Sequence, residues 1–138
     1  MKTTQPRKQR KRIRFDSIHK RRGRLSSPLS SELKESHGTG LIPVRTGDTV
    51  RVMRGDHKGF EGKVTIVNRK NYSLFVEGVT QEKVDGSPVP IPIHPSKVMI
   101  TRLYLDDRRR REALNRKGAN KVETEIPTKS VKKKKGKV

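Results

Sequence analysis

The stretch from Gly47 to Val79 constrains the fold more than any other part of the chain, because apolar and polar residues alternate along it. Val50 and Val52 stand two residues apart, and Val64 and Ile66 repeat that spacing after a glycine-rich loop. Successive side chains of an extended chain point to opposite faces, so a period of two predicts strands with one buried face. We expect these two strands to pair.

A third strand, Tyr72 to Glu77, is predicted after a polar turn at residues 69–71. Together the three strands predict a small curled antiparallel sheet and a mainly β fold. The side chains expected to fill its core are Val50, Val52, Val64, Ile66, Leu74 and Val76.

The loop between the first two strands holds three glycines in eight residues. Glycine tolerates positive φ, so such a loop can turn sharply or bring its backbone close to a partner. The order G-D-x-V-x-V-x-x-G-x-x-K-G-x-x-G-x-V, from Gly47 to Val64, resembles the KOW motif of ribosomal proteins and transcription elongation factors. That resemblance implies a small SH3-like barrel, to which the rest of the sequence adds short helices and basic N- and C-terminal extensions. Its turn glycines would be Gly47, Gly55, Gly59 and Gly62.

The formal net charge of +21 is unevenly distributed. Residues 1–25 hold 11 Lys and Arg against one acid, residues 26–105 hold 11 against 8, and residues 106–138 hold 13 against 5. A nearly neutral middle between two basic ends is typical of a protein that binds a polyanion. The chain has no Cys, which excludes disulfides and thiolate metal sites, and it has no apolar run of membrane-spanning length.

These patterns divide the chain into five segments. Residues 1–25 are predicted to be a basic RNA-binding arm that is disordered when free, and residues 26–40 a short helix and linker. Residues 41–104 are expected to form the barrel and to fold alone. Residues 105–117 are predicted to form a C-terminal helix, and residues 118–138 a basic, disordered tail.

Capping residues locate the expected helices. Ser27 is a candidate N-cap, with Pro28 at the first helical position and Gly38 as the left-handed residue that ends the helix. Asp106 or Asp107 is expected to cap the C-terminal helix.

The segment before that helix has the features of an edge hairpin. Asp85-Gly86 predicts a tight turn, and prolines alternate with apolar residues over 88–93. Proline cannot donate to a neighbouring strand, so this run can form only an edge strand. A last strand, Lys97 to Leu103, is expected to close the barrel.

A family resemblance covers about residues 5–117. The order of five segments resembles that of the universal twenty-fourth protein of the large ribosomal subunit, in its archaeal and eukaryotic branch. These segments are PRKQRKRIRF, HKRR, SSPLSSEL, the KOW stretch and IPIHPSKVMITRL. The resemblance implies a structural role in which the protein binds the 5′ region of large-subunit rRNA early in assembly, near the nascent-chain tunnel exit. It implies neighbouring ribosomal proteins and nascent-chain factors as partners and a cytoplasmic location in the ribosome. We expect neither a membrane partner nor a homo-oligomer.

RNA contacts are expected from the arm and from the loop tips, where basic side chains reach phosphate oxygens. The tips at residues 54–60 and 69–71 are expected to lie close together. Phe60 would stack on a base or enter an RNA cavity, whereas Phe15 would either stack on a base or pack on the domain. The candidate RNA-binding residues are Arg7, Lys8, Arg10, Lys11, Arg12, Arg14, His19, Lys20, Arg21, Arg22, Arg24, Arg54, His57, Lys58, Phe60, Lys63, Arg69, Lys70, His94 and Lys97.

No catalytic or metal-binding pattern is recognisable. The four histidines lack metal-ligand spacing, and no segment resembles a nucleophile elbow. Asp56 and Glu61 are interpreted as turn and solubility residues. We therefore expect no enzymatic activity and no cofactor.

Two other functions share these features. A KOW-type transcription elongation module would need a folded partner domain, and residues 1–40 are too polar to supply one. A basic DNA-architectural protein would bind duplex DNA as well as it binds rRNA.

Overall fold

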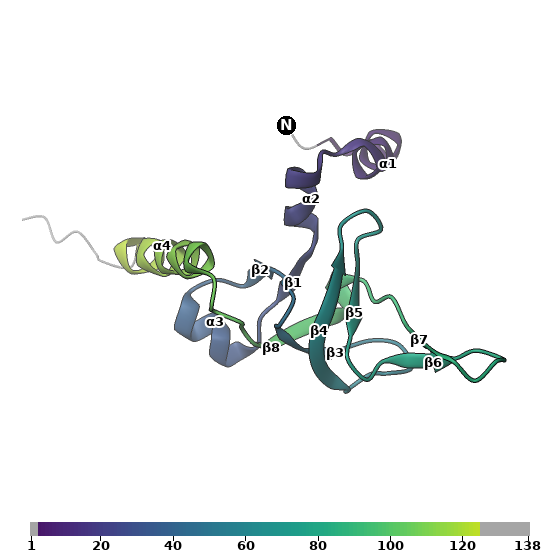
Figure 1. Cartoon of the computed structure of the whole chain (residues 1–138). Coiled ribbons are helices and arrows are strands. Elements are labelled where there is room, and N and C mark those ends of the chain that lie inside the picture. The colour runs from purple at the N-terminus through teal and green to yellow at the C-terminus, as the bar shows by residue number, and fades with distance from the viewer. Residues whose placement is uncertain (1–2, 125–138) are drawn as a thin grey trace, which may run out of the picture.

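The computed structural model describes residues 3–124, which build a small sheet body with helices at both ends (Figure 1). The helices are α1 (Pro6–Phe15), α2 (Ile18–Arg24), α3 (Ser31–His37) and α4 (Arg108–Thr124), and η1 (Pro95–Lys97) is a 3₁₀ turn. The strands are β1 (Ser26–Pro28), β2 (Leu41–Pro43), β3 (Thr49–Val52), β4 (Glu61–Asn68), β5 (Ser73–Val76), β6 (Thr80–Glu82), β7 (Pro88–Pro90) and β8 (Val98–Arg102). The fold is mixed rather than mainly β, because the Arg- and Lys-rich segments are composed of good helix formers.

The central sheet has the order β5-β4-β3-β8, and all its neighbouring strands are antiparallel. The long strand β4 pairs with β3 through its first half and with β5 through its second half, so the sheet bends along β4. The predicted strands and the pairing of the first two are confirmed. Single bridges extend the pairing beyond both edges, from Leu74 to Ile93 beside β5 and from Leu29 to Ile100 beside β8.

Five of the six predicted core residues are buried, and the prediction for Ile66 is wrong because 56% of this residue is exposed. The pairing of β4 with β5 shifts register between Val64 and Ile66. Such an irregularity changes which face the following side chains take. Val67, rather than Ile66, packs against the core.

The predicted helix near residues 26–38 begins later than expected. Ser27 and Pro28 lie in β1, which pairs with β2, and α3 starts only after Ser30. The Ser27 hydroxyl is buried and donates to the Pro95 carbonyl oxygen at 2.6 Å, which holds this segment extended against the sheet body. The end of the helix is as predicted, because Gly38 has a φ of 59°.

The predicted proline-rich hairpin is present. Strands β6 and β7 form a separate two-stranded sheet that projects from the body (Figure 1). Gly86 has a φ of 76°, and its N–H donates to the Lys83 carbonyl oxygen at 2.9 Å. Pro88 and Pro90 lie in β7 at the edge, where the missing donors are tolerated.

The core extends beyond residues 41–104. Leu29 and Leu114 belong to the same buried cluster as the sheet residues and are 0% and 5% exposed. Leu25 is also buried, and its carbonyl oxygen accepts the Val44 N–H at 2.9 Å. The buried unit therefore runs from about Leu25 to at least Leu114, and so includes residues on both sides of the segment 41–104.

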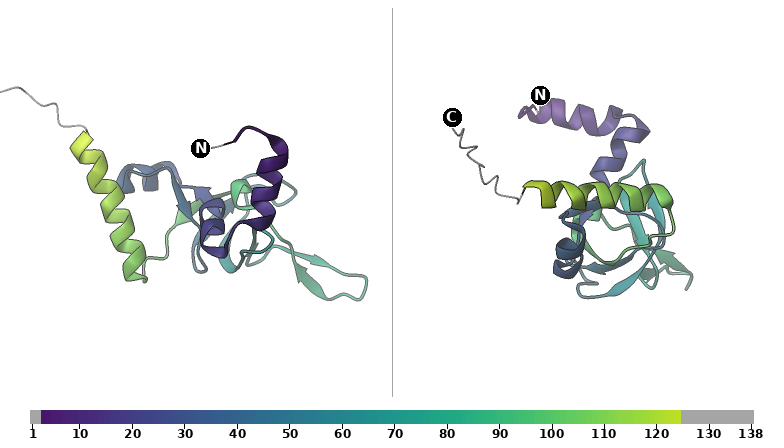
Figure 2. Two further views of the ribbon diagram at one scale, coloured as in Figure 1. Left: turned by 90° about the horizontal axis from the view of Figure 1, so that it is seen from above. Right: turned by 90° about the vertical axis from the view of Figure 1, so that its left-hand side faces the viewer.

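Helix α4 begins where predicted, because the Asp107 carboxylate accepts the Arg109 N–H at 2.9 Å. It continues to Thr124, past the predicted end near residue 117. The rest of the predicted tail, residues 125–138, lies outside the described residues. Figure 2 shows α4 beside the sheet body, whereas α2 leads away from the body and α1 turns off at its far end.

Candidate nucleic-acid interface

The predicted arm forms two helices that have no buried residue. The sequence predicted a segment that is disordered when free, but Pro6 occupies the first turn of α1, and the Arg, Lys and Gln that follow favour a helix. Helix α1 carries Arg7, Lys8, Arg10, Lys11, Arg12 and Arg14, and α2 carries His19, Lys20, Arg21, Arg22 and Arg24. Phe15, at the end of α1, is 71% exposed, with the Arg14 guanidinium 5.8 Å from its ring centre.

Some of these cations are used within the arm. Asp16, between the two helices, pairs with Arg24 at 3.1 Å and with Arg12 at 3.9 Å. The Arg21 guanidinium donates to the carbonyl oxygens of Asp16 at 2.8 Å and Arg14 at 3.0 Å. These contacts fix the bend between α1 and α2, so Arg21 and Arg24 help to shape the arm.

The arm meets the sheet body at the β4–β5 turn. The Tyr72 hydroxyl donates to the Ile13 carbonyl oxygen at 2.9 Å, and the Arg21 guanidinium donates to the Lys70 carbonyl oxygen at 3.4 Å. Arg21 also lies over the Tyr72 ring, 5.7 Å from its centre. Tyr72, which the sequence analysis did not select, has a φ of 53°, rare for a residue other than glycine. The turn that contains this residue thus brings the Tyr72 ring into contact with the arm.

The two loops that we expected to lie together lie at opposite ends of β4. The loop with Arg54, His57, Lys58 and Phe60 precedes β4, and the turn with Arg69 and Lys70 follows it. Strand β4 has eight residues, and a strand rises about 3.3 Å per residue, so roughly 25 Å of strand separates them. That prediction is wrong, because the two loops join opposite ends of one strand.

The β3–β4 loop depends on its glycines in two different ways. Gly55 and Gly59 have φ angles of 96° and 89°, and Gly47, just before β3, has a φ of 92°. A residue with a side chain would have a strained backbone at any of these three positions. Gly62 has no such φ, but a Cβ at this position would lie 2.6 Å from the Glu77 carbonyl oxygen. It is required for close packing of the backbone.

Phe60 packs onto the sheet body, although it is 38% exposed. A Cβ at Gly78 would lie 2.6 Å from its ring, so the ring rests on the backbone there. One face of Phe60 is therefore used within the protein.

The remaining predicted residues lie near that loop. Lys97 ends η1, and its carbonyl oxygen accepts the Met53 N–H at 2.8 Å, so Lys97 joins the β3–β4 loop. The His94 ring accepts the Ser96 N–H at 3.2 Å and so caps η1. Lys63 is exposed on the first half of β4. The structure thus forms two basic surfaces, one at each end of β4.

A cleft opens where the arm, the segment before β3 and the end of β4 meet. It has a volume of about 600 Å³ and is lined by Ile18, His19, Arg22, Leu25, Pro43, Val44, Arg45, Thr46, Val67 and Arg69. Burial, and then the charges of Arg22 and Arg110, lower the pKa of Arg45. Arg45, which the sequence analysis did not select, thus brings a third guanidinium close to two candidate RNA-binding residues.

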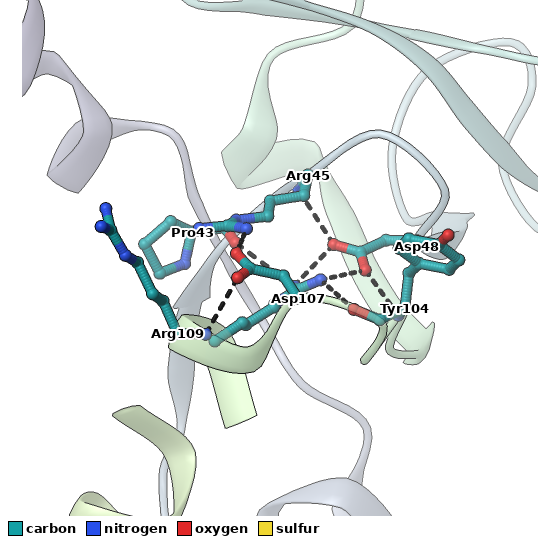
Figure 3. Close-up of polar contacts among 7 residues, drawn as sticks. Pro43, Arg45, Asp48, Tyr104, Asp107 and Arg109 are labelled. Atoms are coloured by element: carbon teal, nitrogen blue, oxygen red, sulfur yellow. Dashed lines mark hydrogen bonds and ion pairs between the residues drawn. The ribbon is translucent and has the colours of Figure 1, made fainter. Parts of the chain in front are cut away.

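A buried ion pair fixes the segment before β3 to α4 (Figure 3). The Arg110 guanidinium donates to both carboxylate oxygens of Asp48, at 2.6 and 2.7 Å. The backbone N–H groups of Arg45 and Tyr104 donate to the same carboxylate, each at 2.9 Å, and Arg45 also pairs with Asp107. Asp48 and Arg110 are 0% and 3% exposed. No local sequence signal indicates this pair, whose members are 62 residues apart.

The described residues offer no metal site. None of their His, Asp and Glu side chains form a group of three that could hold a metal ion. Hydrogen bonds from the Thr101 hydroxyl and the Arg51 guanidinium lower the pKa of Glu61. Glu61 is the first residue of β4 and connects it to β3 and β8, so it belongs to the sheet rather than to a turn. In the part of the chain that the structure describes, no helix is long and apolar enough to cross a membrane.

Comparison with known proteins supports the family predicted from the sequence. Residues 3–117 match the family that comprises the eukaryotic L26 ribosomal proteins and their archaeal counterparts. The chain is 52% identical over 123 residues to large ribosomal subunit protein uL24 of Korarchaeum cryptofilum (strain OPF8), which covers 89% of this chain and 93% of that protein. It is 50% identical over 113 residues to the protein of the same name from Methanosphaera stadtmanae, which covers 82% of this chain and 97% of that protein.

Proposed function

The chain belongs to this family of eukaryotic and archaeal ribosomal proteins, and we propose that, as a structural constituent of the large ribosomal subunit, it holds large-subunit rRNA chiefly through its N-terminal arm. One observation carries this proposal: the 11 Lys and Arg of residues 1–25 lie on a segment whose helices bury nothing in the protein itself. A surface of this kind suits phosphate contacts, which supply a large share of the affinity in protein–nucleic acid complexes.

We further propose that the sheet body is an SH3-like barrel of the KOW class. The curled sheet and the positive φ of Gly47, Gly55 and Gly59 support this assignment. The barrel would position two RNA-binding surfaces, one at the arm and one at the β3–β4 loop. We also propose that the protein binds the 5′ region of the rRNA early in assembly, near the tunnel exit and beside other large-subunit proteins. This part of the proposal is supported by family membership alone.

Deleting residues 1–24 tests the role of the arm, and it spares Leu25, which is buried. We expect the sheet body to remain folded. If about 6 of the arm's cations meet phosphates, the slope of log K against log[salt] for purified large-subunit rRNA should shrink by about 4–5, at ~0.7–0.9 per phosphate.

Deleting residues 125–138 is the matched control, because it removes six Lys but leaves α4 intact. We expect a smaller change in slope from this deletion. A larger change than that caused by the arm deletion would identify the C-terminal segment as the principal RNA-binding element. Equal affinity of the full chain for duplex DNA and rRNA would instead favour a DNA-architectural protein.

A further inference from the structure

The cleft beside α2 has a second, apolar part. A further hollow of about 430 Å³ shares Ile18, Val67 and Arg69 with it and adds Ile66. The two hollows therefore meet along the line between α2 and the end of β4. Ile18 and Ile66 are 64% and 56% exposed, so this apolar surface remains open to solvent between basic residues.

The other part of the cleft collects positive charge. Arg22 lies on α2, Arg45 in the segment before β3 and Arg69 in the β4–β5 turn, and all three line one hollow. Among the ion pairs of the described residues, Arg45 pairs with Asp107, but neither Arg22 nor Arg69 has an acidic partner. Like charges brought together repel one another, and an anion between them would relieve that repulsion.

We propose that this cleft seats one unpaired nucleotide of the RNA, with its phosphate among Arg22, Arg45 and Arg69 and its base over Ile18 and Ile66. The inference rests on the proposed RNA-binding function and adds a specific site to it. Guanidinium groups bind phosphate through paired hydrogen bonds, and an unstacked base presents an apolar face that an aliphatic surface can cover.

A duplex does not suit this site. Its bases are stacked inside the helix, so their faces cannot cover the exposed side chains of Ile18 and Ile66. Its phosphates could meet Arg22 and Arg69 from outside, but the apolar part would stay uncovered. Preference for a single strand therefore distinguishes the proposed site from a general basic surface.

The first experiment tests the charges of the cleft, and it measures the affinity of the full chain for a ten-nucleotide oligouridine. The double variant Arg22→Gln/Arg69→Gln removes two charges from the cleft, and Arg7→Gln/Arg10→Gln removes two from α1 as a matched control. We expect the cleft variant to lose about tenfold in affinity and the control about threefold or less, because only the cleft converges guanidinium groups on one phosphate.

The second experiment tests the apolar part of the cleft. It compares Ile66→Thr with Val84→Thr, which makes the same kind of change at a residue exposed on the β6–β7 hairpin. Ile66→Thr should weaken oligouridine binding about threefold through lost apolar contact, without altering the salt slope. It should leave binding to a ten-base-pair RNA duplex unchanged, and Val84→Thr should change neither.

Two outcomes would overturn the inference while leaving the proposed function in place. One is equal loss of affinity in the two charge variants, and the other is equal behaviour of Ile66→Thr and Val84→Thr. The proposed function itself would fail if the full wild-type chain showed no salt-dependent binding to purified large-subunit rRNA. The two failures are therefore distinguishable in the same set of measurements.

Discussion

The arm helices and α4 have similar compositions but different relations to the rest of the molecule. Both are basic, and both have few apolar residues. The arm buries none of its helical residues and meets the sheet body through hydrogen bonds to exposed groups at the β4–β5 turn. Helix α4 places Leu114 in the core and Arg110 in a buried ion pair with Asp48.

This difference shows that charge alone does not tell whether a basic helix belongs to the fold or extends from it. Two buried residues attach α4 to the sheet body, whereas α1 and α2 bury none, and Leu25 is buried only after α2 has ended. The arm thus leaves most of its cations exposed to solvent, whereas α4 uses part of its charge to hold the protein together.

The largest expected effect follows from cutting the chain at the boundaries predicted from the sequence. A fragment of residues 41–104 lacks β1, Leu29 and Leu114, which complete the core. Small domains bury too little surface to lose such residues and remain stable. We expect residues 25–117 to unfold in a cooperative thermal transition and residues 41–104 to show none, by circular dichroism. A cooperative transition in the shorter fragment would support the narrower domain predicted from the sequence.

The next effect concerns the buried ion pair. Asp48→Asn leaves the Arg110 guanidinium buried without a counter-charge, and breaking a buried pair in this way costs about 3–5 kcal/mol of unfolding free energy. The matched control is Glu112→Gln, which breaks the exposed Arg108–Glu112 pair on the same helix and should cost about 0.5 kcal/mol or less. Urea denaturation measures both. Equal losses would mean that the buried pair does not hold α4 in place.

The smallest effects come from truncating one apolar residue in each region. Leu114→Ala should cost about 2–4 kcal/mol, because it leaves a cavity in the core. Ile13→Ala, on α1, should change stability by less than about 0.5 kcal/mol, because its side chain is 43% exposed. Denaturation midpoints compare the two directly. A loss for Ile13→Ala close to that for Leu114→Ala would show that the arm is part of the folded core.

Much of this protein could be read locally along the chain. The alternating valines predicted the paired strands, Asp85-Gly86 the projecting hairpin, Gly38 the end of α3 and Asp107 the start of α4. The order of motifs also identified the family. The strand, turn and cap signals each lie within a few residues of the structure that they specify, which is why the sequence alone was sufficient for them, whereas the family follows from the order of segments along most of the chain.

Other features depend on residues far apart in the chain. The register shift in β4 exposes Ile66 and turns Val67 inward, and it arises from the pairing with β5. The length of β4 separates two loops that the sequence suggested were neighbours. No pattern within either segment encodes such an arrangement.

The sequence by itself determined the family, the strands and the concentration of charge at the two ends. Only the tertiary structure decided which charges are used within the fold. Arg110 and Arg22 look alike in the sequence, yet Arg110 meets Asp48 in the interior and Arg22 lines an open cleft. The physical reason is that a guanidinium's role depends on which acceptors surround it, and here folding brings those acceptors from distant parts of the chain.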